Sequence, residues 1–466
     1  MLPEPTLTFT LPSLHDGLPL DCRVYHPLSL TASPNAPAWK KHAAIIAHPY
    51  APLGGCYDDP VVDIVASTLL RLGLLVGTFN FRGANGSAGR TSWTAKAERA
   101  DFTSFVGFIT HYVYFLDPFR LLPSSVTLGG HDLATQIDGA QDEIAVALDA
   151  GLDGSSESAP RHMPVLLMGG YSYGAMVTTQ LPSLKTILAP FNTPAHDSYA
   201  AEIRLRAEHL AEMQNEALSG ARAAAVERQS GKPMLRKALG LRVGGDEENR
   251  KSHDHPRHSF HLDPEDRIRK GVAELMVKAR RVSHRKENSH DTIHDASRAV
   301  PEDKDAPHDP THDCLLPLTN DMTHRAAYLL VSPLQGVITN LATMSFPMPF
   351  RKAARRSVSG PIPPGLSKAS TRPDEPAPGS PSEPALVEAE DKLVLNPTLA
   401  IYGDRDGFVA ARKLREWASR LESVSGSRFR AHEVSSAGHF WQEERVAYIM
   451  RDAVKTFVES VLRDGT

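Results

Sequence analysis

The sequence predicts an α/β protein with a mostly parallel central sheet, flanked by helices and interrupted by long low-complexity insertions. Short, wholly apolar runs indicate strands that are covered on both faces of a sheet. Segments with apolar residues at helical spacing alternate with those runs, and this alternation is typical of βαβ units. The composition is also uneven: ten of the 36 prolines fall between Pro347 and Pro384, and ten of the 21 histidines between His253 and His324.

Each strand and helix is predicted from one of these two patterns, the apolar run or the helical spacing. The run Ala43–Ala47 is a strand buried on both faces, whereas Val62, Val65 and Leu69 mark one side of a helix that Gly73 ends. By the same reasoning, strands are expected at residues 6–11, 20–25, 43–47, 74–81, 165–168, 326–331, 398–402 and 429–434. Helices are expected at residues 59–72, 94–112, 175–184, 197–229, 263–281, 410–421 and 443–462, with a short one at 142–148 in a polar connection spanning 119–162.

Two segments do not read as core. The chain divides into an N-terminal part of the core at 1–186, a partly helical and largely disordered insertion at 187–325, and a core strand with a short cap at 326–346. A disordered linker at 347–392 and the C-terminal part of the core at 393–466 complete the division. About 280 residues remain without the inserts, which one α/β domain accommodates.

Composition and charge exclude several classes of protein. With 41% hydrophobic and 23% charged residues the chain is typical of a globular protein, and a net charge of −4 gives no electrostatic reason to bind nucleic acid or an anionic membrane. Three scattered cysteines do not form a disulfide framework. There is no signal-peptide pattern and no apolar run long enough for a stable membrane span, so a cytoplasmic protein is expected.

The stretch Gly170–Gly174 carries the strongest functional signal. A serine, Ser172, lies between two glycines where an apolar run gives way to a helical segment, which is the pattern of a nucleophile elbow. The turn is so tight that its flanking positions leave no room for Cβ atoms. Its geometry lifts the serine hydroxyl above the sheet.

A serine needs a general base and an orienting carboxylate to act as a nucleophile near neutral pH. His439 lies between the last strand and the last helix, and Asp406 follows the strand at 398–402. All three residues therefore come at the C-terminal ends of strands, where open α/β sheets place their sites. Asp404, two residues earlier, is the alternative carboxylate.

An oxyanion hole requires two backbone amides close to the serine. Tyr173, directly after Ser172, would give one, and the loop after residues 43–47 would give the other. In that loop Tyr50 is the expected donor because Pro49 has no N–H. His48 is expected to brace the loop by hydrogen bonding.

These motifs resemble those of the α/β-hydrolase superfamily, closest to its dienelactone-hydrolase-like and small serine esterase branch. The resemblance rests on seven short segments that lie within residues 40–112, 163–186, 326–335 and 397–460: residues 48–49, 79–83, 86–89, 93–101, 170–174, 402–406 and 438–439. It implies a carboxylesterase-type serine hydrolase in which Ser172 is the nucleophile, His439 the base and Asp406 the orienting acid, without metal or organic cofactor. The chain departs from the family in its extra 140 or so residues before the strand at 326–331, which separate Ser172 from Asp406 by 234 positions.

Other interpretations remain open for the whole protein and for single residues. The fold could serve as a catalytically weak scaffold whose inserts recruit protein partners, or as a peptidase or acyltransferase. Arg82 and Ser87 are expected to fix a loop, with Glu98 and Asp101 either solvated or paired with Arg82. The tract His253–His261 has spacing that would suit a metal, but Pro256 and the polar residues around it predict mobility instead. The basic segment 263–281 could dock on a membrane or a partner, although a solvated helix is expected. Val337, Leu341, Met344 and Phe346 would line an apolar acyl pocket.

Overall fold

The computed structural model describes residues 1–33, 35–92, 94–119, 163–230, 264–287, 314–318, 323–334 and 390–464. Eight strands form one sheet in the order β1-β2-β4-β3-β5-β6-β7-β8. Only the first two pairings, β1 with β2 and β2 with β4, are antiparallel, and the other pairings are parallel. The strands are β1 (Leu7–Pro12), β2 (Pro19–Tyr25), β3 (Ala43–Ala47), β4 (Leu75–Phe79), β5 (Val165–Tyr171), β6 (Arg325–Val331), β7 (Thr398–Gly403) and β8 (Phe429–Val434).

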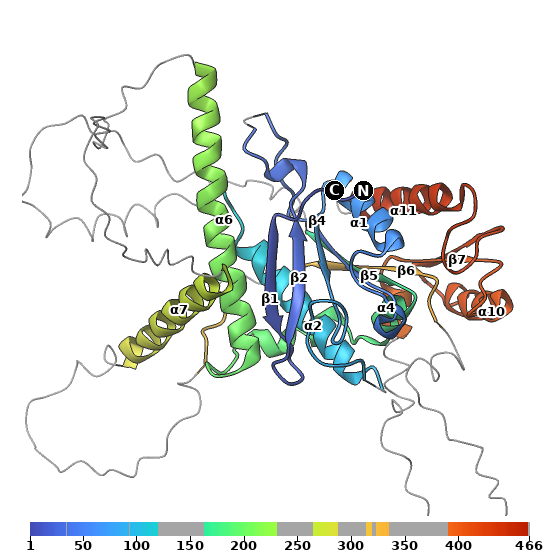
Figure 1. Cartoon of the computed structure of the whole chain (residues 1–466), viewed down its shortest axis with the longest axis horizontal. Helices are drawn as coiled ribbons and strands as arrows, with labels where there is room; N and C mark the ends of the chain where they lie inside the picture. The colour runs from blue at the N-terminus through green and yellow to red at the C-terminus, as the bar shows by residue number, and fades with distance from the viewer. Residues whose placement is uncertain are drawn as a thin grey trace, which may run out of the picture.

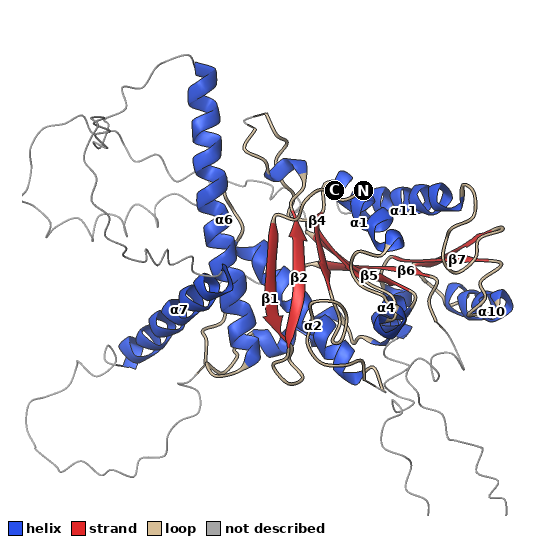
Figure 2. Ribbon diagram, viewed as in Figure 1, coloured by secondary structure: helices blue, strands red, loops and turns tan. Residues whose placement is uncertain are grey.

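Helices cover both faces of this sheet (Figure 1). One face carries α1 (Pro60–Arg71) and α11 (Val446–Arg463), whose apolar sides share a core cluster with β3, β5 and β6. The other face carries α2 (Lys96–Phe115), α4 (Tyr173–Gln180) and α10 (Ala411–Glu422). Short helices α5 (Leu184–Leu188), η1 (Leu28–Leu30), η2 (Ala51–Leu53) and η3 (Ala189–Phe191) complete the layers. Figure 2 shows the same three-layer arrangement by secondary structure, which confirms the predicted fold class.

Burial explains why the central strands form where they do. Every residue of β3, β4, β5 and β7 is buried, as required of strands covered on both faces. In contrast, β8 at the edge of the sheet buries only its two ends. At the start of α1, Asp59 accepts hydrogen bonds from the amides of Val61 and Val62, which caps the helix.

Two long helices lie within the predicted insertion 187–325. Helix α6 (Tyr199–Ser230) packs against α2 and projects beyond the rest of the domain. Helix α7 (Pro264–Glu287) packs against α6 (Figure 1). The first third of α6 is part of the main core, since Ala201, Ile203 and Leu205 are buried in it. The core therefore extends past the predicted boundary at residue 186.

One buried arginine ties both helices to the edge of the sheet. The Arg206 guanidinium in α6 donates to the Thr10 carbonyl of β1 at 2.8 Å and to Glu265 Oε1 of α7 at 2.7 Å. Glu265 also accepts a hydrogen bond from the Thr10 hydroxyl at 2.7 Å. These contacts hold α7 through its first turn and cover the outer edge of β1.

The predicted linker 347–392 also ends earlier than expected. Residues 390–395 form a short helix that leads into β7, and Lys392 within it is buried. The predicted helix at 142–148, the cap residues Val337, Leu341, Met344 and Phe346, and the tract His253–His261 lie outside the described residues.

Candidate active site

Ser172 stands alone in a sharp turn between β5 and α4. Its backbone has φ +54° and ψ −110°, a conformation that L-residues rarely adopt. Two backbone hydrogen bonds hold it there: the Ser172 amide donates to the Val331 carbonyl at 2.8 Å, and the Met176 amide donates to the Ser172 carbonyl at 3.0 Å. The strain is thus supported by β6 on one side and by the first turn of α4 on the other.

The two flanking glycines are required by space. A Cβ atom on Gly170 would lie 2.4 Å from the Gly174 carbonyl carbon, and one on Gly174 would lie 2.5 Å from the carbonyl oxygen of Ala47. Both neighbours are backbone atoms in the centre of the domain and cannot turn aside. The elbow therefore packs directly against the end of β3.

We expect Gly174→Ala to destabilise the protein by at least roughly 1–3 kcal/mol, the usual cost of overpacking. We also expect it to lower any activity by about 10²-fold, because the elbow must shift by a fraction of an ångström or more. Chemical denaturation with a parallel rate measurement tests this. Gly220→Ala in α6 is the matched control: apart from the neighbouring backbone of α6, no atom of the described residues lies within 4 Å of its added Cβ, so helix propensity should stabilise it by up to about 1 kcal/mol. Equal effects of the two substitutions would contradict the packing argument.

Three predicted residues come together above the elbow. His439 Nε2 lies 2.8 Å from Ser172 Oγ, and His439 Nδ1 lies 2.7 Å from Asp406 Oδ2. A carboxylate only accepts hydrogen bonds, so Nδ1 carries the imidazole proton and Nε2 presents its lone pair to the serine hydroxyl. All three side chains are buried, which shields the hydrogen-bonded chain from competing water.

Asp406 is held by its own turn. Its second carboxylate oxygen accepts hydrogen bonds from the amides of Phe408 at 2.8 Å and Val409 at 3.1 Å. The alternative carboxylate, Asp404, points elsewhere and accepts from the Ser436 amide at 2.7 Å. Asp404 thus fixes the loop that carries His439, whereas Asp406 contacts the imidazole.

Aromatic side chains surround the imidazole. The Tyr171 hydroxyl donates to the His439 carbonyl at 2.9 Å, and the Phe408 ring lies 4.4 Å from the imidazole centroid. Phe440 packs edge-on against His439 with 58% of its surface exposed. An exposed aromatic ring beside the imidazole gives an apolar group of an incoming molecule a surface to pack on. Sequence reasoning missed both phenylalanines, because nothing in the local pattern distinguishes them from core residues.

Tyr50 and Tyr173, the two predicted amide donors, are neighbours. Their rings lie 5.1 Å apart, Tyr173 is the first residue of α4, and Tyr50 directly precedes the short helix η2. The first amides of a helix have no partner within that helix, so the Tyr173 N–H is available beside Ser172.

His48 braces the loop that carries Tyr50, as the sequence suggested. Its Nε2 accepts a hydrogen bond from the Phe81 amide at 2.8 Å, so its Nδ1 is the protonated nitrogen, which donates to the Pro49 carbonyl at 2.6 Å. Complete burial lowers the pKa of His48 to about 4, which keeps the ring neutral. A neutral ring is what this pair of hydrogen bonds requires.

This neutral histidine makes stability depend on pH. An unfolded histidine has a pKa of about 6.5, so below that pH the unfolded chain binds a proton that folded His48 refuses, and stability falls as the pH drops from 6.5 towards 4. The share of His48 should be roughly 2 kcal/mol between pH 7 and pH 5. Urea unfolding of the wild type and His48→Gln at both pH values measures it. An equal pH difference in the two proteins would contradict this assignment.

A buried ion pair fixes the loop beneath the site. Arg82 donates to both carboxylate oxygens of Asp101, at 2.9 and 2.7 Å, and reaches the hydroxyl of Ser13. Asp101 is therefore the partner of Arg82 and is fully buried, not solvated. Glu98 is also buried, but it accepts hydrogen bonds from the amide and hydroxyl of Ser92 instead. Ser87 fixes the same loop, its hydroxyl donating to the Asn80 carbonyl at 2.7 Å.

Lys392 supports the elbow from the opposite end of α4. Its buried ammonium donates to the carbonyls of Thr178 at 2.8 Å, Thr179 at 3.0 Å and Leu181, the last turn of the helix that begins beside Ser172. A cation at this end satisfies the free carbonyls and complements the helix dipole. The sequence placed Lys392 in the linker, and a single lysine there carries no signal.

Other predicted features bear on cofactors and membranes. Among the described residues there is no cluster of three or more histidine, cysteine, aspartate or glutamate side chains that would suit a metal ion. None of the helices in the described ranges combines the length and apolarity needed to cross a bilayer. Helix α7, predicted as a basic amphipathic segment, buries Ile268 and Val272 against the core.

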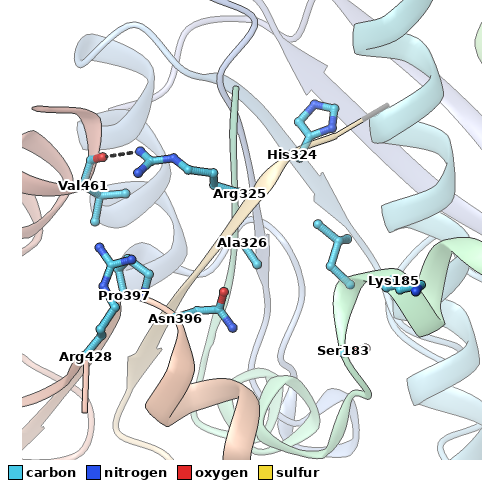
Figure 3. Close-up of a pocket in the computed structure, with 10 residues that line it drawn as sticks. Ser183, Lys185, His324, Arg325, Ala326, Asn396, Pro397, Arg428 and Val461 are labelled. Carbon is cyan, nitrogen blue, oxygen red and sulfur yellow. Dashed lines mark hydrogen bonds between the residues drawn. The ribbon is translucent and has the colours of Figure 1, made fainter. Parts of the chain in front are cut away.

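A cavity of about 310 Å³ lies away from this site (Figure 3). It is lined by residues at the N-terminal ends of parallel strands, such as Ala326 of β6 and Pro397 just before β7. Ser172, Asp406 and His439 follow the C-terminal ends of the strands. The length of a strand, about 3.3 Å per residue, separates the two sites.

Comparisons with known proteins find likeness only among solved structures. No family model and no curated protein matches the chain. The chain is similar to an α/β serine hydrolase without a lid from Xanthomonas campestris, at 14% identity and a TM-score of 0.35 over 99% of this chain and 96% of that one. It is also similar to an α/β serine hydrolase homologue from Coxiella burnetii, at 11% identity and a TM-score of 0.36 over 98% of this chain and 99% of that one. For Est1E of Butyrivibrio proteoclasticus with bound ferulic acid, the identity is 11% and the TM-score 0.32, over 96% of each chain.

The strand order and the elbow of this chain define its fold without those comparisons. Two antiparallel pairings at one edge, six parallel strands and a serine in a strained turn after β5 are the features of the α/β-hydrolase fold. The chain has this fold.

Proposed function

We propose that the protein is a serine hydrolase that cleaves an ester or related acyl bond. The observation that carries this proposal is the continuous hydrogen-bonded chain from Ser172 Oγ through the imidazole of His439 to the carboxylate of Asp406. The order Ser, Asp, His along the sequence is that of enzymes with this fold. A scaffold protein would have no need for a strained serine aimed at a buried imidazole.

The first half of the proposed reaction acylates the serine. Ser172 Oγ attacks the acyl carbonyl while His439 Nε2 takes the hydroxyl proton, and the negative charge moves to the carbonyl oxygen. The backbone amides of Tyr173 and Tyr50 bind that oxygen, and loss of one such donor typically costs about 10²–10³-fold in turnover. The intermediate then collapses, the bond to the leaving oxygen breaks, and His439 returns the proton to the departing alcohol.

The second half restores the enzyme. Water attacks the acyl carbon, gives one proton to His439 Nε2, and releases the carboxylic acid as the proton passes back to Ser172. Asp406 holds the imidazole in one tautomer and stabilises its positive charge in both halves. The exposed ring of Phe440 and the neighbouring Phe408 favour a substrate with an apolar group next to the scissile bond.

The experiment is a pair of measurements on purified protein: hydrolysis of short p-nitrophenyl esters and labelling by a fluorophosphonate probe. A serine hydrolase reacts in both assays, and the labelled residue is identified by peptide mass spectrometry. Labelling of a residue other than Ser172, or of none, would contradict the proposal.

A further inference from the structure

The cavity in Figure 3 has a distinctive charge. Its described lining includes Lys185, His324, Arg325 and Arg428 but no aspartate or glutamate. The chain as a whole carries a net charge of −4, so the charge of this lining is opposite in sign to that of the whole chain. We call this space the basic cavity.

The basic side chains of this cavity differ in their hydrogen bonds and ion pairs. Arg325 donates to the carbonyls of Val461 at 2.7 Å and Asp464 at 3.2 Å, which anchors its guanidinium to the end of α11. Its Nε is buried and has no hydrogen-bond partner. Arg428 forms an ion pair with the Asp464 carboxylate at 3.1 Å, and both side chains are about half exposed.

Lys185 is different from the two arginines. It is exposed at the start of α5, across the cavity from Arg428 in Figure 3. Within the described part of the chain its ammonium makes no hydrogen bond and no ion pair. The basic cavity therefore has at least one cation, Lys185, free to bind an anion, whereas the Arg325 guanidinium on the other side of the cavity is held by two carbonyls.

A second, larger cavity adjoins the first. It has a volume of about 540 Å³, which is in the usual range for small-molecule sites. The two cavities share Leu184, Lys185 and His324 in their walls. The larger one is otherwise mainly apolar, and we call it the apolar cavity; its lining includes Met163, Leu188, Phe191 and Leu318.

We infer that the two cavities together form a binding site for an amphipathic carboxylate of the fatty-acid class. The carboxylate would lie in the basic cavity next to Lys185, which lines both cavities, and the hydrocarbon chain would lie in the apolar cavity along Leu184 and Leu188. An inorganic anion would leave the apolar cavity unused, and a neutral lipid would leave the basic groups unused. The site lies at the N-terminal ends of the strands, whereas Ser172 lies at their C-terminal ends. Binding there does not depend on the reaction proposed for Ser172.

Binding is tested with dodecanoate as the probe, below its micellar concentration, by isothermal titration calorimetry on full-length Ser172→Ala. This variant removes hydrolysis from the measurement, so failure here and failure of the proposed function are distinguishable. We expect dodecanoate to bind at least tenfold more tightly than dodecan-1-ol or acetate. Equal binding of dodecanoate and the alcohol would overturn the inference, because the basic groups would then contribute nothing.

Variants locate the site. Lys185→Glu should weaken dodecanoate binding at least tenfold, and Leu188→Trp should weaken it by filling the apolar cavity. Lys413→Glu changes another exposed lysine, on α10, and should leave affinity within twofold. Full binding by Lys185→Glu would overturn the inference. Loss of dodecanoate binding after fluorophosphonate labels Ser172 of the wild type would also overturn it, because the ligand would then lie at the elbow.

A membrane surface could present the same chemistry as a free fatty acid. Sedimentation with phosphatidylglycerol vesicles distinguishes the two sources. We expect the protein to stay in the supernatant while it binds monomeric dodecanoate. Sedimentation with the vesicles that Lys185→Glu abolishes would overturn the inference in favour of a lipid headgroup.

Discussion

Replacement of Ser172 by alanine is expected to lower ester hydrolysis by about 10⁶-fold and to abolish fluorophosphonate labelling, while the fold stays intact. The substitution removes one oxygen atom, the one that lies 2.8 Å from His439 Nε2. Alanine keeps the Cβ that the turn already accommodates, so the elbow loses its nucleophile and little of its packing. Initial rates on p-nitrophenyl butyrate, with circular dichroism and a melting curve, measure both sides of this expectation.

A second serine gives the matched control. Ser419 is exposed on α10, and Ser419→Ala removes the same atom far from the site. Its rate should stay within about twofold of the wild type, the size expected for a surface change. If labelling survives Ser172→Ala, then Ser172 is not the nucleophile and the proposed function falls.

Asp406→Asn is expected to lower the rate by about 10⁴-fold, the second largest effect. An asparagine can donate as well as accept, so it can hold His439 in the tautomer whose proton faces the serine, and this tautomer cannot take the serine's proton. The backbone bonds from Phe408 and Val409 to the side-chain oxygen can persist. The defect should therefore appear in the rate of acylation more than in stability.

Asp404→Asn is the control that distinguishes a catalytic effect of Asp406→Asn from an effect on loop structure. Asp404→Asn changes the same chemical group two residues away, where the side chain accepts a hydrogen bond from the Ser436 amide. An amide oxygen can still accept that bond, so the rate should fall by less than tenfold. If Asp404→Asn were the more damaging of the two, the roles assigned from the distances to His439 would be wrong.

The sequence predicted the parallel strands of the sheet closely, and the reason is physical. A strand covered on both faces must be apolar at every position, so β3 stands out as an apolar run whose ends coincide with the observed Ala43 and Ala47. The candidate site was equally accessible to sequence reasoning. Three residues that follow strands at one edge of a parallel sheet must come close together, however long the insert between them.

Features that depend on tertiary packing could not be predicted. The first turns of α6 have the Ala/Glu/Arg composition of a solvated helix, yet Ile203 and Leu205 are buried because α2 lies beside them. Lys392 looks like an ordinary charged residue of a polar linker until the end of α4 is placed next to it. Partners so distant in sequence leave no local pattern.

The position of β6 has a consequence for how the chain is made. This strand is buried along nearly its whole length, but it pairs with β5 on one side and with β7 on the other, and β7 begins only at Thr398. A ribosome adds roughly 5–20 residues per second, so the 66 residues between the two strands take about 3–13 s to synthesise. For that time an apolar strand has an open edge, which is a template for wrong pairing. Nascent chains in which residue 331 has left the ribosome and residue 398 has not are therefore where we expect aggregation and chaperone binding to be greatest.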